Sequence, residues 1–324
     1  MGYNVNLFTF LLIKCRMLKI LLGVKVMFIA LNGQLGSGKT ALCALFRDLD
    51  GYDIFSTGKI QREYANELGI STLELNERSK TDYSYDYAID KKLMDYGEAN
   101  KGKNIVFDSR MAWHFLKDVY KVHLLIRPAT AADRVFGKRE SKEETYKSRE
   151  EAMSELVKRR DMENDRYNKV YNVNMYDFRN YDLILDTTKL TPEETYQIIL
   201  RESSKRESVV YVAPNNIYPS NTKETYSVDQ AKEVLKIMDV YTHIPTMSLI
   251  KIGENLFTYE KENLLLACNL ADIKLIRADK VYTEEEILPN GQKAIDYIKS
   301  SMADIREWEK LNNFTFDFYP ENIK

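Results

Sequence analysis

The stretch Val26–Asn32 (VMFIALN), followed at once by Gly33–Thr40 (GQLGSGKT), decides the fold of this chain. The first segment is almost entirely apolar, which is typical of a strand buried on both faces of a parallel sheet. The second segment fits the pattern G-x-x-x-x-G-K-[ST] in full, and Ala41–Leu49 after it has the spacing of a helix. Strand, glycine loop and helix in this order predict a loop that wraps phosphate groups.

The residue types of the loop explain how it would bind a triphosphate tail. Gly33, Gly36 and Gly38, with Ser37 between them, let backbone N–H groups turn toward phosphate oxygens. The N-terminal end of the following helix adds positive potential. Lys39 would neutralise the β- and γ-phosphates, and Thr40 would hold Mg²⁺ through its hydroxyl. The loop leaves open which group receives the phosphoryl.

Four further short apolar runs alternate with helical patterns up to about residue 203. The runs are Asp53–Ser56, Asn104–Asp108, Tyr120–Ile126 and Tyr181–Asp186. The helical patterns are Ile60–Leu68, Asp86–Asn100, Ala129–Phe136 and a segment from Pro192 to Ser203. This alternation predicts an α/β domain with a doubly wound parallel sheet over residues 27–203. In such sheets the ligand binds beyond the carboxyl ends of the strands.

Polar side chains follow two of these strands. Ser56, Gly58 and Arg62 open a helix and could hold a second phosphate, or they form an ordinary helix cap with a solvated arginine. Asp108 ends a buried strand and could ligate Mg²⁺ through water or orient an arginine. Arg110 could bind phosphate in a bidentate manner. Alternatively, Asp108 and Arg110 could form an ion pair in a surface turn. The position at the sheet edge favours the functional interpretation.

The segment 138–168 is dense in charge and predicts a solvated helix or a mobile lid. Phosphoryl transfer uses cations that arrive when the site closes and excludes water. The candidate cations are Arg134, Arg139, Arg159, Arg160 and Arg166. We expect only some of these five arginines to act in this way.

With these segments in order, the chain resembles the cytidylate kinase-like branch of nucleoside monophosphate kinases over about residues 27–203. The resemblance rests on GQLGSGKT, then STGKIQREYANELG from Ser56, NIVFDSRMAWHF from Asn104, KRRDMENDRYNKVYNV from Lys158 and YDLILDTTKLTPEET from Tyr181. It implies transfer of the ATP γ-phosphoryl group to CMP or dCMP with Mg²⁺. Lys59 stands where relatives often have an acidic or small residue, so base and sugar preference stay open.

The resemblance also implies a set of site residues. It implies ATP contacts at Gly36, Gly38, Lys39 and Thr40, and monophosphate contacts at Ser56, Gly58, Arg62, Asp108 and Arg110. It implies lid contacts from Arg160, Asp161 and Arg166. The transfer step would then depend on Lys39, Arg110, Arg160 and Arg166, through positioning and charge neutralisation. Metal contacts would come from Thr40 and Asp108.

A composition break at Glu202–Glu207 (ESSKRE) precedes a second predicted part, residues 207–324. Its strand patterns are Val209–Val212, Met247–Ile252, Asn255–Tyr259 and Ile273–Arg277; its helical patterns are Val228–Met238, Glu262–Leu270 and Ile295–Lys310. They predict a smaller α+β domain. It resembles the ParB/sulfiredoxin-like fold over about 207–285, but Tyr259–Asn263 lacks the arginine of that family's site. We interpret it as a regulatory or interaction module for an unidentified protein or small ligand.

Composition excludes several other classes of protein. The 324 residues have a formal net charge of −2, so no basic excess indicates nucleic-acid binding. Cys15, Cys43 and Cys268 lie far apart, which argues against a disulfide framework or a zinc site and favours a cytoplasmic location. Charged residues interrupt the apolar segment within residues 1–26, so we predict an upstream extension rather than a membrane anchor.

Two functions follow from the sequence. The first is a kinase that phosphorylates a nucleoside monophosphate. The second is an ATP-binding regulatory protein, with weak or no kinase activity, that signals through its C-terminal part. A third and weaker possibility is the phosphorylation of another small acceptor or of a nucleic-acid end.

Overall fold

The computed structural model describes residues 27–79, 81–136, 146–205, 207–220, 228–237, 243–301, 309–311 and 313. The predicted extension 1–26, Arg139 and part of the helix predicted over Ile295–Lys310 lie outside the described residues. Within the described part of the chain, no helix is both long and apolar enough to cross a membrane.

The first part contains five strands with helices between them. In chain order these are β1 (Phe28–Gly33), α2 (Lys39–Asp50), β2 (Asp53–Ser56), α3 (Thr57–Glu67), α4 (Thr72–Arg78), α5 (Ser84–Ala99), β3 (Ile105–Asp108), α6 (Ala112–Phe115), β4 (Val119–Leu125), α7 (Pro128–Val135), α8 (Arg149–Tyr171), the 3-10 turn η1 (Phe178–Asn180), β5 (Leu183–Asp186) and α9 (Pro192–Ser203). All five predicted strands are present. The short helices α4 and α6 were not predicted, because neither is long enough to show a helical repeat.

The second part adds four strands and three helices among the described residues. They are β6 (Val209–Val212), the 3-10 turn η2 (Pro214–Asn216), α10 (Val228–Ile237), β7 (Thr246–Ile252), β8 (Asn255–Tyr259), α11 (Glu262–Leu270), β9 (Ile276–Thr283) and α12 (Ala294–Ser301). The prediction for the last strand, Ile273–Arg277, was wrong in its bounds. The strand runs on through the exposed charged residues Asp279 and Lys280, which obscure its pattern.

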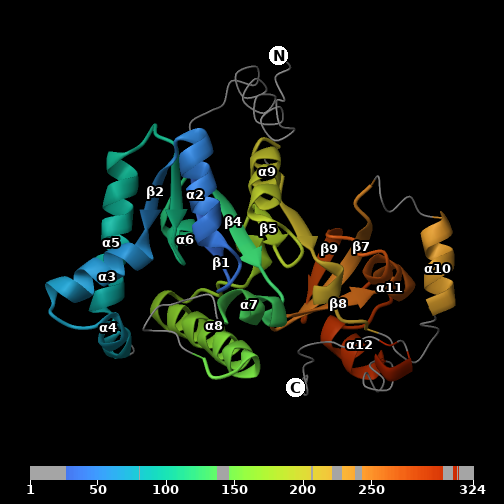
Figure 1. Ribbon diagram of the computed structural model, residues 1–324. Coiled ribbons are helices and arrows are strands. Elements are labelled where there is room, and N and C mark those ends of the chain that lie inside the picture. The colour runs from blue at the N-terminus through green and yellow to red at the C-terminus, as the bar shows by residue number, and fades with distance from the viewer. Residues whose placement is uncertain are drawn as a thin grey trace, which may run out of the picture.

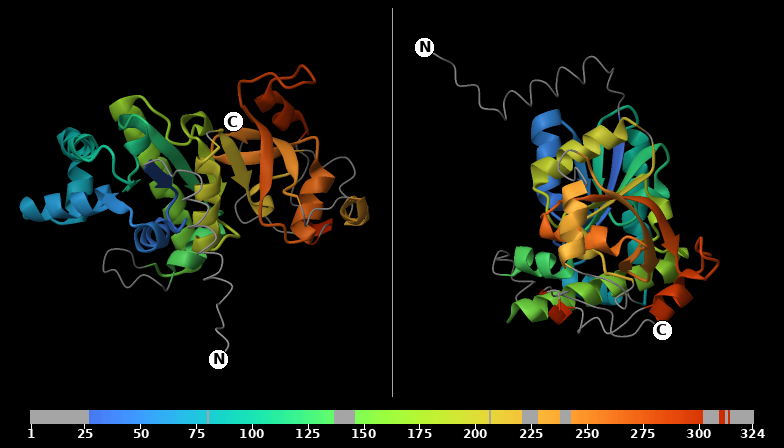
Figure 2. Two further views of the ribbon diagram at one scale, coloured as in Figure 1. Left: turned by 90° about the horizontal axis from the view of Figure 1, so that it is seen from above. Right: turned by 90° about the vertical axis from the view of Figure 1, so that its right-hand side faces the viewer.

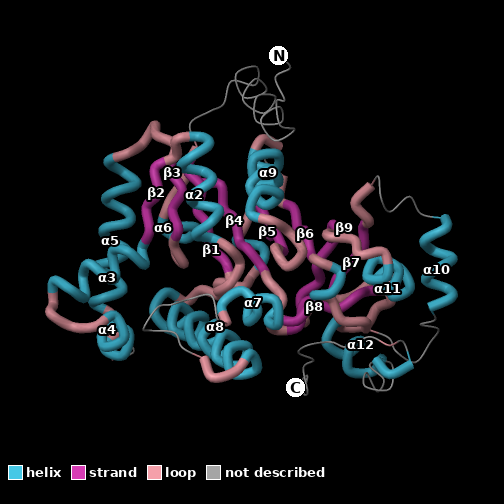
Figure 3. The backbone as a smooth tube through the Cα atoms, in the orientation of Figure 1, coloured by secondary structure: helices cyan, strands magenta, loops and turns pink. Residues whose placement is uncertain are grey.

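All nine strands form one sheet in the order β2-β3-β1-β4-β5-β6-β9-β7-β8, seen as a continuous row in Figure 3. Neighbouring strands from β2 to β6 are parallel. β9 joins β6 in the antiparallel sense, β7 is parallel to β9, and β8 is antiparallel to β7. The fold is therefore α/β with a mixed, mostly parallel sheet. The predicted boundary near residue 203 falls between α9 and β6, inside this sheet.

Side chains of the strands build a core on each face of the sheet. Ile29 and Leu31 belong to one cluster and Ala30 to another, because successive side chains of a strand point to opposite faces. Helices α2 and α9 contact each other over the first face, and α5 and α6 contribute residues to the second cluster. Helices on both faces are the doubly wound arrangement that the sequence predicted.

The carboxyl ends of the parallel strands meet at one edge of the sheet. In Figure 1, α7 and α8 lie beneath this edge, below the central strands. The charge-rich segment forms a helix from Arg149 onward, which ends at Tyr171 because Asn172 takes a left-handed conformation with φ 55°. Figure 2 shows the strands of the second part beside those of the first, along the same sheet.

Candidate phosphate-binding site

The loop between β1 and α2 has the backbone that a phosphate cradle needs. Gly36 and Gly38 have φ values of 82° and 90°, in the left-handed region that favours glycine. A Cβ atom at Gly36 would lie 3.0 Å from the Cα and Cβ atoms of Ala131 in α7. The loop therefore combines left-handed glycine backbone with close contact to α7, so that a side chain at Gly36 would disturb both.

Two cationic side chains meet at the start of this loop. Lys39 Nζ donates to the carbonyl oxygen of Gly33 at 2.8 Å, and Arg110 Nη1 donates to the same oxygen. Burial, together with the positive charge of Arg110, lowers the pKa of Lys39 to about 7. The carbonyl carries no net charge, so an anion placed here would interact favourably with both side chains.

The predicted side chains at the ends of β2 and β3 also come together. The register pairs Ser56 with Asp108, and the Ser56 hydroxyl donates to Asp108 Oδ2 at 3.4 Å. A Cβ atom on Gly58 would be 3.7 Å from Nη1 of Arg62 and 3.8 Å from Oγ of Ser56. Ser56, Gly58 and Arg62 thus form one corner beside Asp108, with Arg62 exposed.

Glu163 of α8 is a site residue that the sequence analysis missed. Its carboxylate lies 3.0 Å from Nε of Arg110 and 3.1 Å from Nε of Arg159. Burial raises the pKa of Glu163, but the two arginines outweigh it and leave the pKa below its usual value. Arg159 stands four residues earlier, a spacing that predicts an ion pair within a helix. No spacing in the sequence indicates that Arg110 pairs with Glu163.

The remaining arginines of α8 point to separate partners. Arg160 Nε donates to Asp161 at 2.8 Å, and Nη2 of Arg166 lies 3.6 Å from Oδ1 of Asp86 in α5. Glu163 therefore links Arg110 to α8. Arg160 instead pairs with its neighbour Asp161, and Arg166 lies next to Asp86.

Arg134 of α7 holds the shape of the loop. It donates to the carbonyl oxygen of Thr187 at 2.8 Å and to that of Gly36 at 3.2 Å. The hydroxyl of Thr187 lies 3.1 Å from the carbonyl oxygen of Ser37. This arginine ties the glycine loop to the segment between β5 and α9. In this structure its hydrogen bonds support the loop, and a role as a lid cation stays a prediction.

Two residues near the loop suit a magnesium ion with bound phosphates. Thr40 is exposed in the first turn of α2, and the Asp108 carboxylate accepts only one long side-chain hydrogen bond among the described residues. Ser37 is buried, and its hydroxyl has no hydrogen-bond partner there. The described residues contain no cluster of three or more His, Cys, Asp or Glu side chains that could hold a metal alone. Magnesium held by Thr40 and Asp108 would take its further ligands from phosphate oxygens and water.

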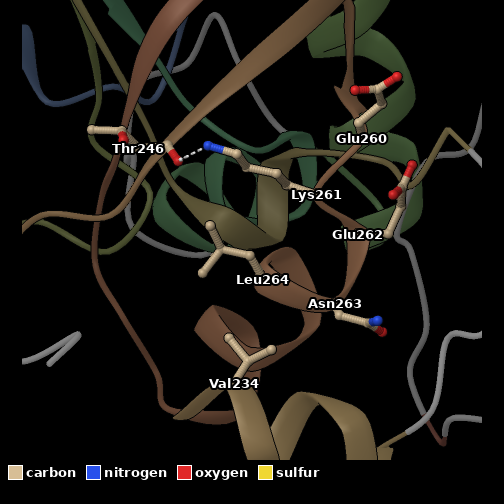
Figure 4. A pocket seen from close by; sticks show the side chains of 7 residues that line it. All are labelled: Val234, Thr246, Glu260, Lys261, Glu262, Asn263 and Leu264. Carbon is tan, nitrogen blue, oxygen red and sulfur yellow. Dashed lines mark hydrogen bonds between the residues drawn. The ribbon is translucent and has the colours of Figure 1, made fainter. Parts of the chain in front are cut away.

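A hollow of about 470 Å³ lies in the C-terminal part, between α10 and the start of α11 (Figure 4). Its lining includes Glu260–Leu264 together with Thr246, whose carbonyl oxygen accepts from Lys261 Nζ at 3.2 Å. This is the place where the ParB/sulfiredoxin-like resemblance put a site that lacks its arginine. That the C-terminal part binds a protein or a small ligand stays a prediction.

Comparison with known proteins identifies relatives of the first part. The sequence profile of the cytidylate kinase-like family matches residues 28–189, half of the chain. A cytidylate kinase of Natronomonas pharaonis is 31% identical over 175 residues, which are 53% of this chain and 87% of that protein. A cytidylate kinase of Saccharolobus islandicus is 25% identical over 174 residues, 54% of this chain and 89% of that protein.

One relative matches more of the chain. An S-adenosylmethionine-dependent nucleotide dehydratase of Lacinutrix mariniflava is 24% identical over 286 residues, which cover 85% of this chain but only 58% of that protein. The match must therefore extend well beyond residue 189. Among solved structures, the shikimate kinase of Bacteroides thetaiotaomicron has a TM-score of 0.37 and 14% identity, over 54% of this chain and 96% of that one.

Proposed function

The chain belongs to the cytidylate kinase-like family, and on that premise we propose that it transfers the γ-phosphoryl group of ATP to a nucleoside monophosphate, CMP or dCMP. The observation that carries this proposal is the meeting of Lys39 and Arg110 on the carbonyl oxygen of Gly33. Lys39 comes from the loop that would hold ATP. Arg110 follows β3, on the side of the predicted acceptor residues. Cationic side chains from these two sides suit a phosphoryl group that is transferred from ATP to the phosphate of the acceptor.

In the proposed reaction, an oxygen of the acceptor phosphate attacks the γ-phosphorus of ATP. A new P–O bond forms there, and the bond to the β–γ bridging oxygen breaks, which leaves ADP and a nucleoside diphosphate. Lys39 and the loop N–H groups would hold the β- and γ-phosphates. Arg110 would leave Glu163 and bind the acceptor phosphate. The lid residues Arg160, Asp161 and Arg166 would have to change partners as the site closes.

Magnesium fits the same edge of the sheet. When bound, it would neutralise the charge that develops on the phosphate oxygens. The hydroxyl of Thr40 and the carboxylate of Asp108 are the groups that would hold it, the latter directly or through water. Ser56 would keep Asp108 oriented through the bond at the ends of β2 and β3.

The test is ADP release from ATP and Mg²⁺ with a panel of nucleoside monophosphates. We expect one or a few monophosphates to stimulate ADP release, and the Lys39→Ala variant to lose that stimulation. Folding of the variant is checked by its thermal unfolding. ADP release that ignores every monophosphate, or that survives in the variant, would refute the proposal.

The dehydratase activity named for one relative is not part of this proposal. This chain spans 58% of that protein's length, and the activity named for that protein is said of it alone. The cytidylate kinases, in contrast, are matched over 87% and 89% of their own lengths.

A second function, regulation through the C-terminal part, is favoured by one contact region. Glu254 lies in the turn between β7 and β8, and it is near enough to Arg160 of α8 for the two charges to shift each other's pKa. Burial raises the pKa of Glu254, while Lys251 and Arg160 lower it. Glu254 also lies 3.4 Å from Lys251 Nζ. The C-terminal part therefore places a carboxylate beside a predicted lid arginine.

The Glu254→Gln variant tests this coupling. Without the opposing charge, Arg160 would be freer to reach a phosphate, so kcat with the preferred monophosphate should change severalfold while the Kd for ATP stays the same. The exposed pair of Lys232 and Asp229 in α10 offers a matched control, since Asp229→Asn removes a charge from the same part of the chain. Equal kinetics in wild type and Glu254→Gln would exclude regulation through this contact.

A further inference from the structure

A buried carboxylate, Asp186, lies where the first part of the sheet meets the second. It ends β5, and its side chain is completely buried. Its Oδ1 accepts from the backbone N–H of Thr188 at 2.9 Å and from the hydroxyl of Thr188 at 2.5 Å. Its Oδ2 accepts from Nδ2 of Asn216 at 2.8 Å, and the backbone N–H of Ala213 also bonds to the carboxylate. The C-terminal part therefore supplies donors to a carboxylate that belongs to the first part.

A buried carboxylate depends on all of its donors, because leaving one of its oxygen atoms unpaired is unfavourable. Burial raises the pKa of Asp186, and the hydrogen bonds from Thr188, Asn216 and Ala213 oppose that rise. Loss of the Asn216 amide would therefore leave Oδ2 of Asp186 short of a donor. The turn that follows β5 would then be held less firmly in its present position.

The turn after β5 is the segment that supports the phosphate loop. Thr187, its first residue, donates from its hydroxyl to the carbonyl oxygen of Ser37 at 3.1 Å. The carbonyl oxygen of Thr187 accepts from Arg134 at 2.8 Å, and Arg134 donates in turn to the carbonyl oxygen of Gly36 at 3.2 Å. The C-terminal part, this turn and the glycine loop are thus joined in one series of contacts.

Other polar contacts cross the same junction, but they are more exposed. Lys189 Nζ donates to the carboxylate of Asp272 at 2.7 Å, and the Asp272 side chain is 89% exposed. Lys274 Nζ donates to the carboxylate of Glu194 in α9 at 2.5 Å, and the two side chains are 52% and 40% exposed. Exposed ion pairs contribute little to stability. The bond to the buried carboxylate is therefore the contact of this junction through which the C-terminal part reaches the loop.

We propose that Asn216 is a positioning residue for the phosphate loop, acting through Asp186, so that the C-terminal part sets how tightly the loop holds a triphosphate. This inference rests on the proposed function only in taking ATP as the ligand of the loop. Without the Asn216 bond, the turn and the loop sample more positions, and the loop N–H groups are less well placed for phosphate oxygens. By thermodynamic reciprocity, ATP bound at the loop makes the contact between Asp186 and Asn216 firmer.

The first experiment needs no ligand and measures amide hydrogen exchange in the full chain. In Asn216→Ala, exchange should be about fivefold faster in peptides covering residues 33–40 and 186–191, because both segments lose the same support. Lys274→Gln is a matched control, since it breaks a contact across the same junction and should leave exchange in these peptides unchanged. Equal exchange in wild type and Asn216→Ala, or the same acceleration in the control, would overturn the inference.

The second experiment measures the Kd values for ATP and for CMP by calorimetry. Asn216→Ala should raise the Kd for ATP about fivefold and leave that for CMP unchanged, because the predicted acceptor residues follow β2 and β3, away from β5 in the sheet. Asn215→Ala is the control, since it removes an amide from the same turn whose side-chain oxygen has no hydrogen-bond partner among the described residues. If Asn216→Ala loses only thermal stability, or weakens both ligands equally, then Asn216 joins the two parts and does not position the loop.

A double-mutant cycle shows whether Asn216 acts through Asp186. Asp186→Asn keeps the shape of the side chain and removes the charge to which Asn216 donates. Adding Asn216→Ala to this variant should cause no further rise in the Kd for ATP. Additive effects of the two substitutions would overturn the inference.

Wild type alone covers the case in which the variants fail to fold. Bound ATP should slow amide exchange in a peptide covering residues 213–217, and an unchanged rate would overturn the inference. These results are separate from ADP release. ATP binding without phosphoryl transfer to any monophosphate would refute the proposed kinase and leave the role of Asn216 intact.

Discussion

ATP binding should take up a proton at Lys39 above neutral pH. The pKa of this lysine is lowered to about 7 by burial and by Arg110, so at pH 8 about nine-tenths of the ligand-free protein would carry a neutral amine there. The β- and γ-phosphates would restore the charge. Each bound ATP should then take up about 0.9 proton at pH 8, from the same titration arithmetic.

The same titration fixes the pH dependence of the affinity. Well above the pKa, each pH unit costs about 1.4 kcal/mol of binding free energy, so the Kd for ATP should rise about tenfold from pH 8 to pH 9. Calorimetry in two buffers with different ionisation enthalpies measures the proton uptake, and the titrations give the Kd.

Lys39→Arg is the control variant, because a guanidinium stays charged over this pH range. It should bind ATP without proton uptake and with a flat pH profile. Wild type that shows no uptake, or an uptake that persists in Lys39→Arg, would show that Lys39 is not the group that meets the phosphates.

Three further substitutions probe other parts of the site. Arg110→Ala should raise the KM for the monophosphate or lower kcat about 100-fold, as expected for one lost charge contact of about 3 kcal/mol, with little change in ATP binding; loss of ATP binding in calorimetry would contradict this assignment. Arg134→Ala should weaken ATP binding about tenfold, because the loop loses its bond at the Gly36 carbonyl; an unchanged Kd would count against that role. Gly33→Ala should lower the free energy of unfolding by about 1–3 kcal/mol, because its Cβ would lie 2.7 Å from Cβ of Leu124; a variant as stable as wild type in urea would disprove the crowding.

Local patterns were enough to predict the first half of the fold. The glycine loop, the five parallel strands and the helices α2, α5 and α9 each leave a signal within about a dozen residues, since burial on both faces or a helical repeat shapes the sequence locally. The predicted strand ends placed Ser56 and Asp108 at the same edge of the sheet without coordinates. That the two residues are paired in register depends on β2 and β3 being neighbours, which the structure shows.

Long-range pairing, in contrast, was decided by the tertiary structure. Nothing in Val209–Val212 indicates that it extends the first sheet beside β5, because a short apolar run fits either face and either sheet. The contact of Glu163 with Arg110 joins residues 53 positions apart, and Asp86 meets Arg166 across 80 positions. Such pairs depend on how α8 packs against α5 and against the segment after β3, which no periodicity in the sequence indicates.

The sequence by itself thus predicted the glycine loop, the strands whose ends carry the candidate site residues, and the family. Only the tertiary structure decided which charges face one another: Lys39 beside Arg110, Glu163 between two arginines, and Asp86 beside Arg166. The physical reason is that backbone preference and burial act over neighbouring residues, whereas ion pairs and unsatisfied polar atoms arise where distant segments pack together.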